Sequence, residues 1–212
     1  CWITIFCPWG DTMNKRFALK LIAISALVAG AAGLLSACSE AAKSFTSIDL
    51  TGADYARDFA LTDHQGQARV LKDFSGKVVV MFFGYAQCPD VCPTTMAELA
   101  EVKTLLGKDG ERLQALFVTV DPQRDTPAVL KAYMGNFDPS FLALYTTPEK
   151  LQALAKDYKV YYKKVPGKTE GSYTMDHSAG SYVYDTQGKL RLFTRYGSGA
   201  AALAADIQQL LD

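Results

Sequence analysis

The 212-residue sequence has little of several features that would each indicate a class of protein. Its 22 basic and 22 acidic side chains leave no excess of positive charge, which argues against a nucleic-acid partner. Five cysteines are too few for a disulfide-rich scaffold, and two histidines allow few imidazole ligands. The composition argues against intrinsic disorder, because 49% of the residues are hydrophobic and 11% are aromatic. The composition predicts one globular domain with a sizeable core.

The sequence also lacks a long, strongly apolar run. A basic stretch at residues 14–20 precedes residues 21–37, which are uncharged but rich in alanine and glycine. Since a membrane-spanning helix needs about 20 strongly apolar residues, we interpret residues 1–37 as a signal peptide, with an uncleaved anchor as the alternative. The basic region begins only after Met13, so we expect translation to start at Met13 and the preceding residues to be an over-extension.

The end of this segment, Leu35-Ser36-Ala37-Cys38, resembles the lipobox of bacterial lipoproteins. The resemblance implies that Cys38 carries lipid and becomes the new N-terminus, which would anchor the protein on a membrane facing the periplasm. The resemblance does not decide whether this membrane is the inner or the outer one. Residues 38–54 are small and polar and are interpreted as the lipidated N-terminus and its tether. The folded domain is expected over residues 55–212.

Apolar runs and helical patterns alternate along this domain. Residues 78–84 form a continuous apolar run typical of a strand buried on both faces. The other predicted strands are residues 115–120, 141–145, 181–185 and 189–195, the last two joined as a hairpin. The predicted helices are residues 93–106, two that begin at Thr126-Pro127 and Thr147-Pro148, and residues 200–211. We expect residues 160–165 to be extended and exposed, and residues 167–173 to form a polar loop. This order predicts an α/β layer sandwich with a mixed central sheet and flanking helices.

The only cysteines in this domain are Cys88 and Cys92, between the central strand and the following helix. The carboxyl edge of a sheet is where open α/β proteins place their sites. Two cysteines four residues apart near a first helical turn project to the same side, so their sulfurs can bind each other or share an ion. A purely stabilising disulfide is the weaker interpretation, because so small a loop removes little unfolded-state entropy.

A metal site needs a further ligand, and the sequence offers two histidines. His64 lies in a polar turn, where a solvent-exposed imidazole is the simpler interpretation. His177 precedes the strand at 181–185, and parallel neighbours bring such distant loops to one sheet edge. Its residue pattern alone leaves open whether it is a ligand. Two thiolates and one imidazole form a soft, three-coordinate set that favours Cu(I), although Asp176 or Asp121 as an oxygen ligand leaves zinc open.

Three segments carry a family resemblance. They are Phe83-Gly84-Tyr85-Ala86-Gln87-Cys88-Pro89-Asp90-Val91-Cys92-Pro93, then Val120-Asp121-Pro122-Gln123-Arg124-Asp125-Thr126-Pro127, and Asp176-His177-Ser178. Together they resemble the hallmark segments of the Sco/SenC family, and the likeness covers about the whole exported domain. Gln87 stands where many members carry a histidine, and Ala86 where many carry threonine. Because that histidine is not a ligand in the family, Gln87 bears on tuning rather than on binding.

The resemblance implies a thioredoxin-like fold and a copper chaperone that assembles the binuclear copper centre of cytochrome c oxidase, rather than an enzyme. It implies that Cys88, Cys92 and His177 bind copper, with Asp176 and Asp121 supporting them; Cu(I) is expected, and binding of Cu(II) is left open. The implied partners are the copper-bearing oxidase subunit, another periplasmic copper donor and a thiol reductant.

Two alternatives from other classes stay open. A periplasmic thiol-disulfide oxidoreductase would also use Cys88 and Cys92 as a redox-active pair, and would reduce the cysteines of the copper centre or of other exported proteins. An ordinary member of that class, however, has two residues between its cysteines rather than three. A purely structural lipoprotein would leave the pairing of the two cysteines unexplained.

Overall fold

The computed structural model describes residues 44–211. The expected signal peptide, the start at Met13 and the lipidation of Cys38 lie outside the described residues. Within residues 44–211, every helix is too short or too polar to cross a membrane.

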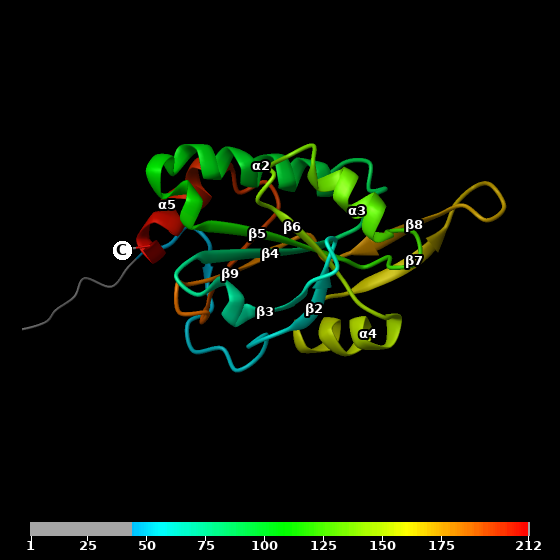
Figure 1. Cartoon of the computed structure of the whole chain (residues 1–212), viewed down its shortest axis with the longest axis horizontal. Coiled ribbons are helices and arrows are strands. Elements are labelled where there is room, and N and C mark those ends of the chain that lie inside the picture. The colour runs from blue at the N-terminus through cyan, green and yellow to red at the C-terminus, as the bar shows by residue number, and fades with distance from the viewer. Residues whose placement is uncertain (1–43, 212) are drawn as a thin grey trace, which may run out of the picture. The chain divides into compact units, whose positions relative to one another are not determined.

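An eight-stranded mixed sheet forms the centre of the fold (Figure 1). From edge to edge its strands are β1 (Ile48–Asp49), β10 (Leu190–Thr194), β9 (Ser181–Tyr184), β4 (Val78–Gly84), β5 (Leu113–Thr119), β6 (Leu142–Tyr145), β2 (Ala60–Asp63) and β3 (Ala68–Val70). The central pairs β4–β5 and β5–β6 are parallel, and the flanking pairs are antiparallel. The predicted mixed sheet is confirmed.

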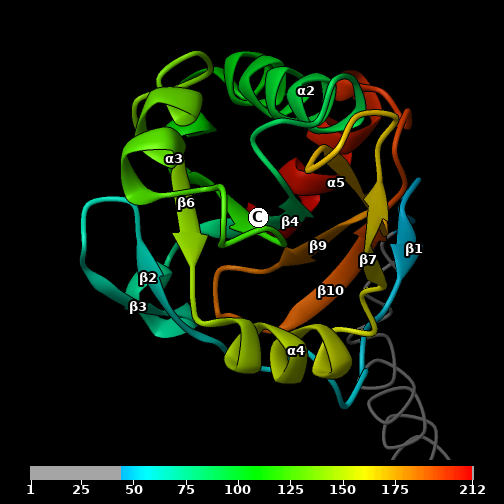
Figure 2. The same ribbon diagram turned by 90° about the vertical axis from the view of Figure 1, so that its right-hand side faces the viewer.

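Helices cover both faces of this sheet. They are α2 (Val91–Leu105), α3 (Pro127–Met134), α4 (Pro148–Asp157) and α5 (Ala200–Leu211), with 3₁₀ turns η2 (Leu71–Phe74) and η3 (Gly107–Arg112). Figures 1 and 2 show α2, α3 and α5 on one face and α4 on the other. The hydroxyls of Thr126 and Thr147 accept hydrogen bonds from the first turns of α3 and α4, as the Thr-Pro pattern predicts. The layer sandwich is therefore confirmed.

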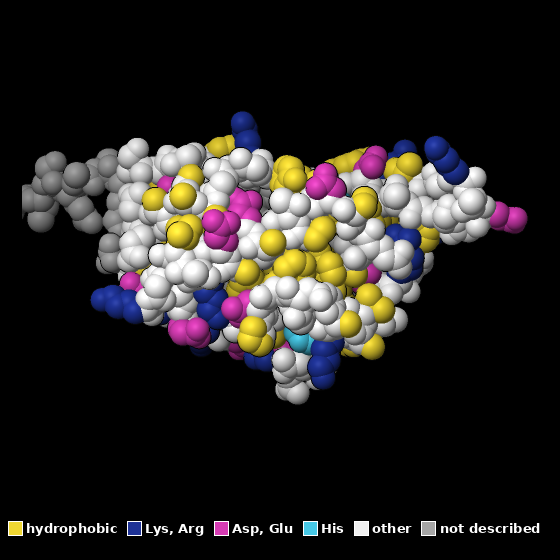
Figure 3. Space-filling view, turned by 90° about the horizontal axis from the view of Figure 1, so that it is seen from above, with side chains coloured by type: hydrophobic (Ala, Val, Ile, Leu, Met, Phe, Trp, Pro, Cys, Tyr) yellow, Lys and Arg dark blue, Asp and Glu magenta, His cyan; other side chains and the backbone are white. Residues whose placement is uncertain are grey.

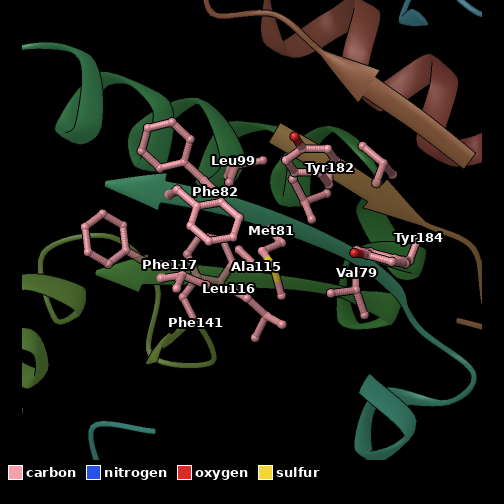
Figure 4. Close-up of a cluster of buried hydrophobic side chains, with 14 of the residues drawn as sticks. Val79, Met81, Phe82, Leu99, Ala115, Leu116, Phe117, Phe141, Tyr182 and Tyr184 are labelled. Carbon is pink, nitrogen blue, oxygen red and sulfur yellow. The ribbon is translucent and has the colours of Figure 1, made fainter. Parts of the chain in front are cut away.

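The core lies against the central strands. Every residue of β4 and of β5 is buried, because helices cover both faces of these strands. Figure 4 shows Phe82 of β4 and Phe117 of β5 side by side, with Leu99 of α2 near Phe82. Outside the core, Figure 3 shows acidic and basic side chains interspersed over the face that carries α2 and α3. This scatter agrees with the neutral composition.

Helix α2 begins two residues earlier than predicted, at Val91, so that Cys92 and Pro93 both lie in its first turn. The prediction placed Pro93 at the first helical position. The first N–H groups of a helix have no intrahelical partner, so a proline fits there without loss of a hydrogen bond. The correction places Cys92 within the helix rather than before it.

The predicted polar loop at 167–173 is shorter than expected, and His177 does not lie in a loop. Strands β7 (Tyr162–Pro166) and β8 (Tyr173–His177) pair as an antiparallel hairpin, with Tyr162 opposite His177. Polar Thr174 and Asp176 point outward between residues that are buried or half-buried. That alternation over 173–177 was the available signal for a strand.

The N-terminal part contributes more to the fold than its composition indicates. Hairpin β2–β3 was not predicted, since its strands have only four and three residues and carry no continuous apolar run. Contacts to the domain also begin upstream of the predicted start at residue 55. The carboxylate of Asp206 in α5 accepts hydrogen bonds from the backbone N–H groups of Thr46 and Ser47, each at 2.8 Å.

Gly84, at the end of β4, yields a stability prediction. A Cβ atom there would lie 2.8 Å from the Cys92 sulfur and 2.8 Å from the rings of Phe82 and Phe117. Gly84→Ala is therefore expected to lower the free energy of unfolding by about 1–3 kcal/mol, measured by urea denaturation. Gly135→Ala is the control, because its Cβ would meet nothing closer than 3.5 Å. Equal stabilities of the two variants would contradict the packing argument.

Candidate metal centre

The two cysteines lie where β4 passes into α2, at the carboxyl edge that Figure 2 faces. Cys88 is in the turn after the strand, and its N–H donates to the carbonyl of Tyr85 at 3.1 Å. The N–H of Cys92 points at the sulfur of Cys88, 3.5 Å away. Both are free thiols. The turn therefore holds two sulfurs together without a covalent bond between them.

The environments of the two thiols differ. Cys88 is half-buried, whereas Cys92 is fully buried at 0% exposure. Burial raises the pKa of the Cys92 thiol far above its ordinary value, and the neighbouring Cys88 adds to this effect. Cys92 is therefore a neutral thiol at physiological pH until a cation replaces its proton.

His177, the last residue of β8, completes the group. Its Nε2 lies 3.4 Å from the sulfur of Cys92, and its Nδ1 lies 2.9 Å from the carbonyl of Ser178. A carbonyl only accepts, so Nδ1 carries the proton, and Nε2 of the neutral ring offers a lone pair to Cys92. Burial lowers the pKa of His177, which favours the neutral form. The imidazole thus has the tautomer that a metal ligand at Nε2 requires.

Aromatic rings fix the orientation of this imidazole. The rings of Phe82 and Tyr85 each meet it edge-on, with centroids 5.9 Å away. The three ligand atoms of Cys88, Cys92 and His177 lie within 4.8 Å of one another, and no other such group of three occurs in residues 44–211. The structure therefore brings together the three residues that the sequence predicted as ligands.

The two predicted supporting carboxylates are outside this group. Asp121, after β5, accepts hydrogen bonds from Arg124 and, at 3.0 Å, from the hydroxyl of Tyr173. Asp176 is exposed on β8, opposite Lys163. Its negative charge nevertheless acts on the site, since it opposes the lowering of the His177 pKa. A supporting role for either residue stays a prediction.

The prediction that the His64 imidazole is exposed to solvent is wrong. His64 is half-buried in the turn after β2, and its Nδ1 accepts a hydrogen bond from the N–H of Ala143 at 3.1 Å. The turn itself was predicted, but its contact with Ala143 of β6, which partly buries His64, was not. His64 therefore has a structural role at the sheet edge.

Arg124 is a residue that the sequence reasoning missed. It was noted only as part of the segment 120–127. Its guanidinium contacts Asp121, Gln87 and Tyr173, so it links the loop after β5 to the cysteine turn and to the hairpin. The available signal was its place three residues after Asp121 in that segment.

A cavity of about 520 Å³ lies between α4 and the β7–β8 hairpin. Leu151 and Ala155 of α4 form one wall, and Met175 of β8 lies on the other. This space lies between the hairpin and α4.

The dithiol–imidazole group in an α/β sandwich defines a class of metal-binding, thioredoxin-like proteins, and comparisons place the chain within it. The family model SCO1/SenC matches residues 49–212. The copper-bound structure of ScoI from Bradyrhizobium japonicum is 42% identical, with a TM-score of 0.66 over 72% of this chain and 97% of that one. Copper-bound yeast Sco1 is 35% identical, with a TM-score of 0.64 over 72% of this chain and 85% of that one.

Curated relatives give the same result. The mitochondrial Protein SCO2 homolog of Bos taurus is 39% identical over 68% of this chain and 53% of its own length. Protein SCO1 of Saccharomyces cerevisiae is 40% identical over 62% of this chain and 45% of its own length. The chain thus spans about half the length of these two relatives. It belongs to the SCO1/SenC family.

The unequal burial of the thiols leads to a reactivity prediction. At neutral pH, iodoacetamide is expected to modify Cys88 much faster than Cys92, because Cys92 is buried and its pKa is raised. Mass spectrometry of proteolytic peptides measures the two rates. In 8 M urea the rates should become similar, which is the control. Faster modification of Cys92 in the folded protein would contradict the described site.

Proposed function

We propose that this chain is a membrane-anchored copper chaperone, which binds Cu(I) through Cys88, Cys92 and His177 and delivers it to the binuclear copper centre of cytochrome c oxidase. One observation carries the proposal: two thiol sulfurs and an imidazole nitrogen lie within 4.8 Å of one another. Two thiolates and one imidazole suit Cu(I), whereas a structural zinc site needs four protein ligands. Cu(I) is the oxidation state proposed, and binding of Cu(II) is left open.

Uptake of Cu(I) by this site requires the release of protons from its thiols. Cu(I) binding replaces the protons of two thiols, one of them on a sulfur whose pKa burial raises. His177 needs no such step, because its Nε2 already offers a lone pair. The bound ion would offset one of the two negative charges that the thiolates bring to the buried site, and the softness of two sulfur ligands, rather than charge, favours Cu(I).

Ligand exchange is the proposed route of delivery. Because Cys88 is half-buried and Cys92 fully buried, a partner thiolate reaches the ion from the side of Cys88 first. The partner's thiolates then replace the chaperone's ligands one at a time, and each released sulfur regains a proton. Copper is never released to water. The recipient proposed is the copper-bearing oxidase subunit, and another periplasmic protein is the proposed donor.

The location follows from the sequence. The basic and apolar segments at 1–37 and the lipobox-like Cys38 support a lipoprotein that faces the periplasm. The tether proposed for residues 38–54 would be limited to the part before Thr46, since Thr46, Ser47 and β1 already contact the domain predicted over residues 55–212. Similarity to proteins named as mitochondrial is compatible with such an anchored, exported domain. The membrane that carries it, inner or outer, is left open.

A second function uses the same two sulfurs. A half-buried Cys88 beside a buried Cys92 is the arrangement of a dithiol reductant. The Cys88 thiolate would attack a partner disulfide and release one partner thiol. Cys92 would then displace the second thiol, so that two electrons pass to the partner and a Cys88–Cys92 disulfide forms. A periplasmic dithiol would have to reduce that disulfide again. Because the oxidised pair has no thiolates, it cannot hold copper.

Copper binding gives the first functional prediction. Anaerobic titration of the reduced domain with Cu(I), in competition with a chromophoric chelator, is expected to show one ion per chain. Cys88→Ser or Cys92→Ser should abolish this binding, because each removes a thiolate. His177→Ala should weaken it with the fold intact. His64→Ala is the matched control. Unchanged affinity in either cysteine variant would exclude the proposed site.

Delivery gives the second functional prediction. In cells that lack the native gene, the wild-type chain is expected to restore cytochrome c oxidase activity, and the His177→Ala variant should restore much less. The alternative function keeps both cysteines and does not need His177, so full restoration by this variant would favour thiol reduction. Insulin reduction at a rate comparable to a thioredoxin would favour it as well.

A further inference from the structure

The hairpin that carries His177 is joined to the central sheet by no strand pairing, although the buried Met175 packs in the core. Strands β7 and β8 pair only with each other and with no strand of the eight-stranded sheet. On one side they face the cavity of about 520 Å³ rather than packed side chains of α4. The hydrogen bonds at the hairpin base, between Tyr161 and Ser178, stay within the hairpin. Its orientation must therefore be fixed by side-chain contacts with the domain.

Arg124 supplies contacts of this kind. One nitrogen of its guanidinium, Nη1, donates both to the carbonyl of Tyr173 at 2.9 Å and to Oε1 of Gln87 at 3.1 Å. Tyr173 begins β8, and Gln87 directly precedes Cys88. Nε of Arg124 forms an ion pair with Asp121, and the two side chains are 21% and 5% exposed. A single planar group thus joins the cysteine turn, the loop after β5 and the start of the His177 strand.

Tyr173 strengthens this connection. The guanidinium carbon of Arg124 lies 3.5 Å from the centroid of the Tyr173 ring, and Nζ of Lys164 lies 3.7 Å from the same centroid. The hydroxyl of Tyr173 donates to Asp121 at 3.0 Å. Backbone, ring and hydroxyl of one residue are therefore all held by the Arg124–Asp121 pair.

The position of Tyr173 along β8 makes this attachment consequential. His177 lies four residues further along the strand, a length of about 13 Å. A tilt of about 5° at Tyr173 would therefore displace His177 by about 1 Å over that strand length. The Nε2 of His177 is now 3.4 Å from the Cys92 sulfur, so such a displacement is large enough to lose or keep a ligand bond.

We propose that Arg124 is a positioning residue, which holds the β7–β8 hairpin against the cysteine turn and so places His177 as the third copper ligand. The proposal rests on the proposed function, since it concerns the same three ligands. Arg124 touches none of them. It acts through Tyr173 on the histidine side and through Gln87 on the cysteine side.

The test is a double-mutant cycle between Arg124 and His177, measured as Cu(I) affinity by chelator competition. Arg124→Met removes the charge and every side-chain hydrogen bond but keeps an unbranched stem that reaches about as far as Nε. It is expected to weaken Cu(I) binding about tenfold, the effect of losing a charged hydrogen bond of about 1.5 kcal/mol. In the His177→Ala background the same substitution should change the affinity less than about twofold.

Arg191→Met is the matched control. Arg191 lies on β10 and is 26% exposed. It forms an ion pair with Asp185 and a hydrogen bond to Thr51. It is therefore similar to Arg124 in exposure and bonding but remote from the cysteines. We expect its substitution to leave Cu(I) affinity unchanged in both backgrounds.

X-ray absorption of the Cu(I)-loaded protein gives a readout that general destabilisation would not produce. Arg124→Met should retain the scattering of two sulfurs and lose that of the imidazole, whereas Arg191→Met should retain both. Arg124→Lys keeps the charge without the planar fork, so it should lie between wild type and Arg124→Met in affinity. Should Arg124→Met fail to fold, Arg124→Lys carries the same cycle.

The possible outcomes separate this proposal from the proposed function. If His177→Ala alone leaves affinity unchanged, the proposed ligand set fails. If His177→Ala weakens binding but Arg124→Met does not, or if the loss in Arg124→Met persists in the His177→Ala background, the positioning role is overturned.

Discussion

The contact between the end of β4 and the first turn of α2 is the constraint on which the site depends. A Cβ at Gly84 would lie only 2.8 Å from the sulfur of Cys92, so only glycine lets the helix approach this closely. The close approach buries Cys92 completely while Cys88 stays half-buried in the turn. The difference in burial between two neighbouring thiols then determines which is accessible and which titrates at unusually high pH.

Much of the fold could be predicted because its signals are local. The apolar run at 78–84 and the two Thr-Pro pairs each indicate one element through backbone and burial preferences of a few residues. The cysteine pair was equally local. By contrast, only part of the hairpin β7–β8 was predicted: the extended stretch at 160–165 agrees with β7, but no hydrophobic run marks β8 or its pairing.

The parts of the site that could not be derived are those that depend on long-range geometry. Residue type and position made His177 a candidate, and a family resemblance predicted that it is a ligand. Its tautomer, however, follows from the carbonyl of Ser178, and its ring orientation from Phe82 and Tyr85. Likewise Arg124 lies in a segment that the sequence singled out, but its contacts with Gln87 and Tyr173 exist only in the folded chain.

The two halves of the site are therefore held by different means. The cysteines lie on a rigid strand–helix junction in the core, where a change of volume is costly. The histidine lies on a hairpin that no main-chain ladder joins to the central sheet. A carrier must bind its ion firmly and also give it up. Under the proposed function, a dithiol held in the core and a third ligand on a separately attached hairpin would meet both demands.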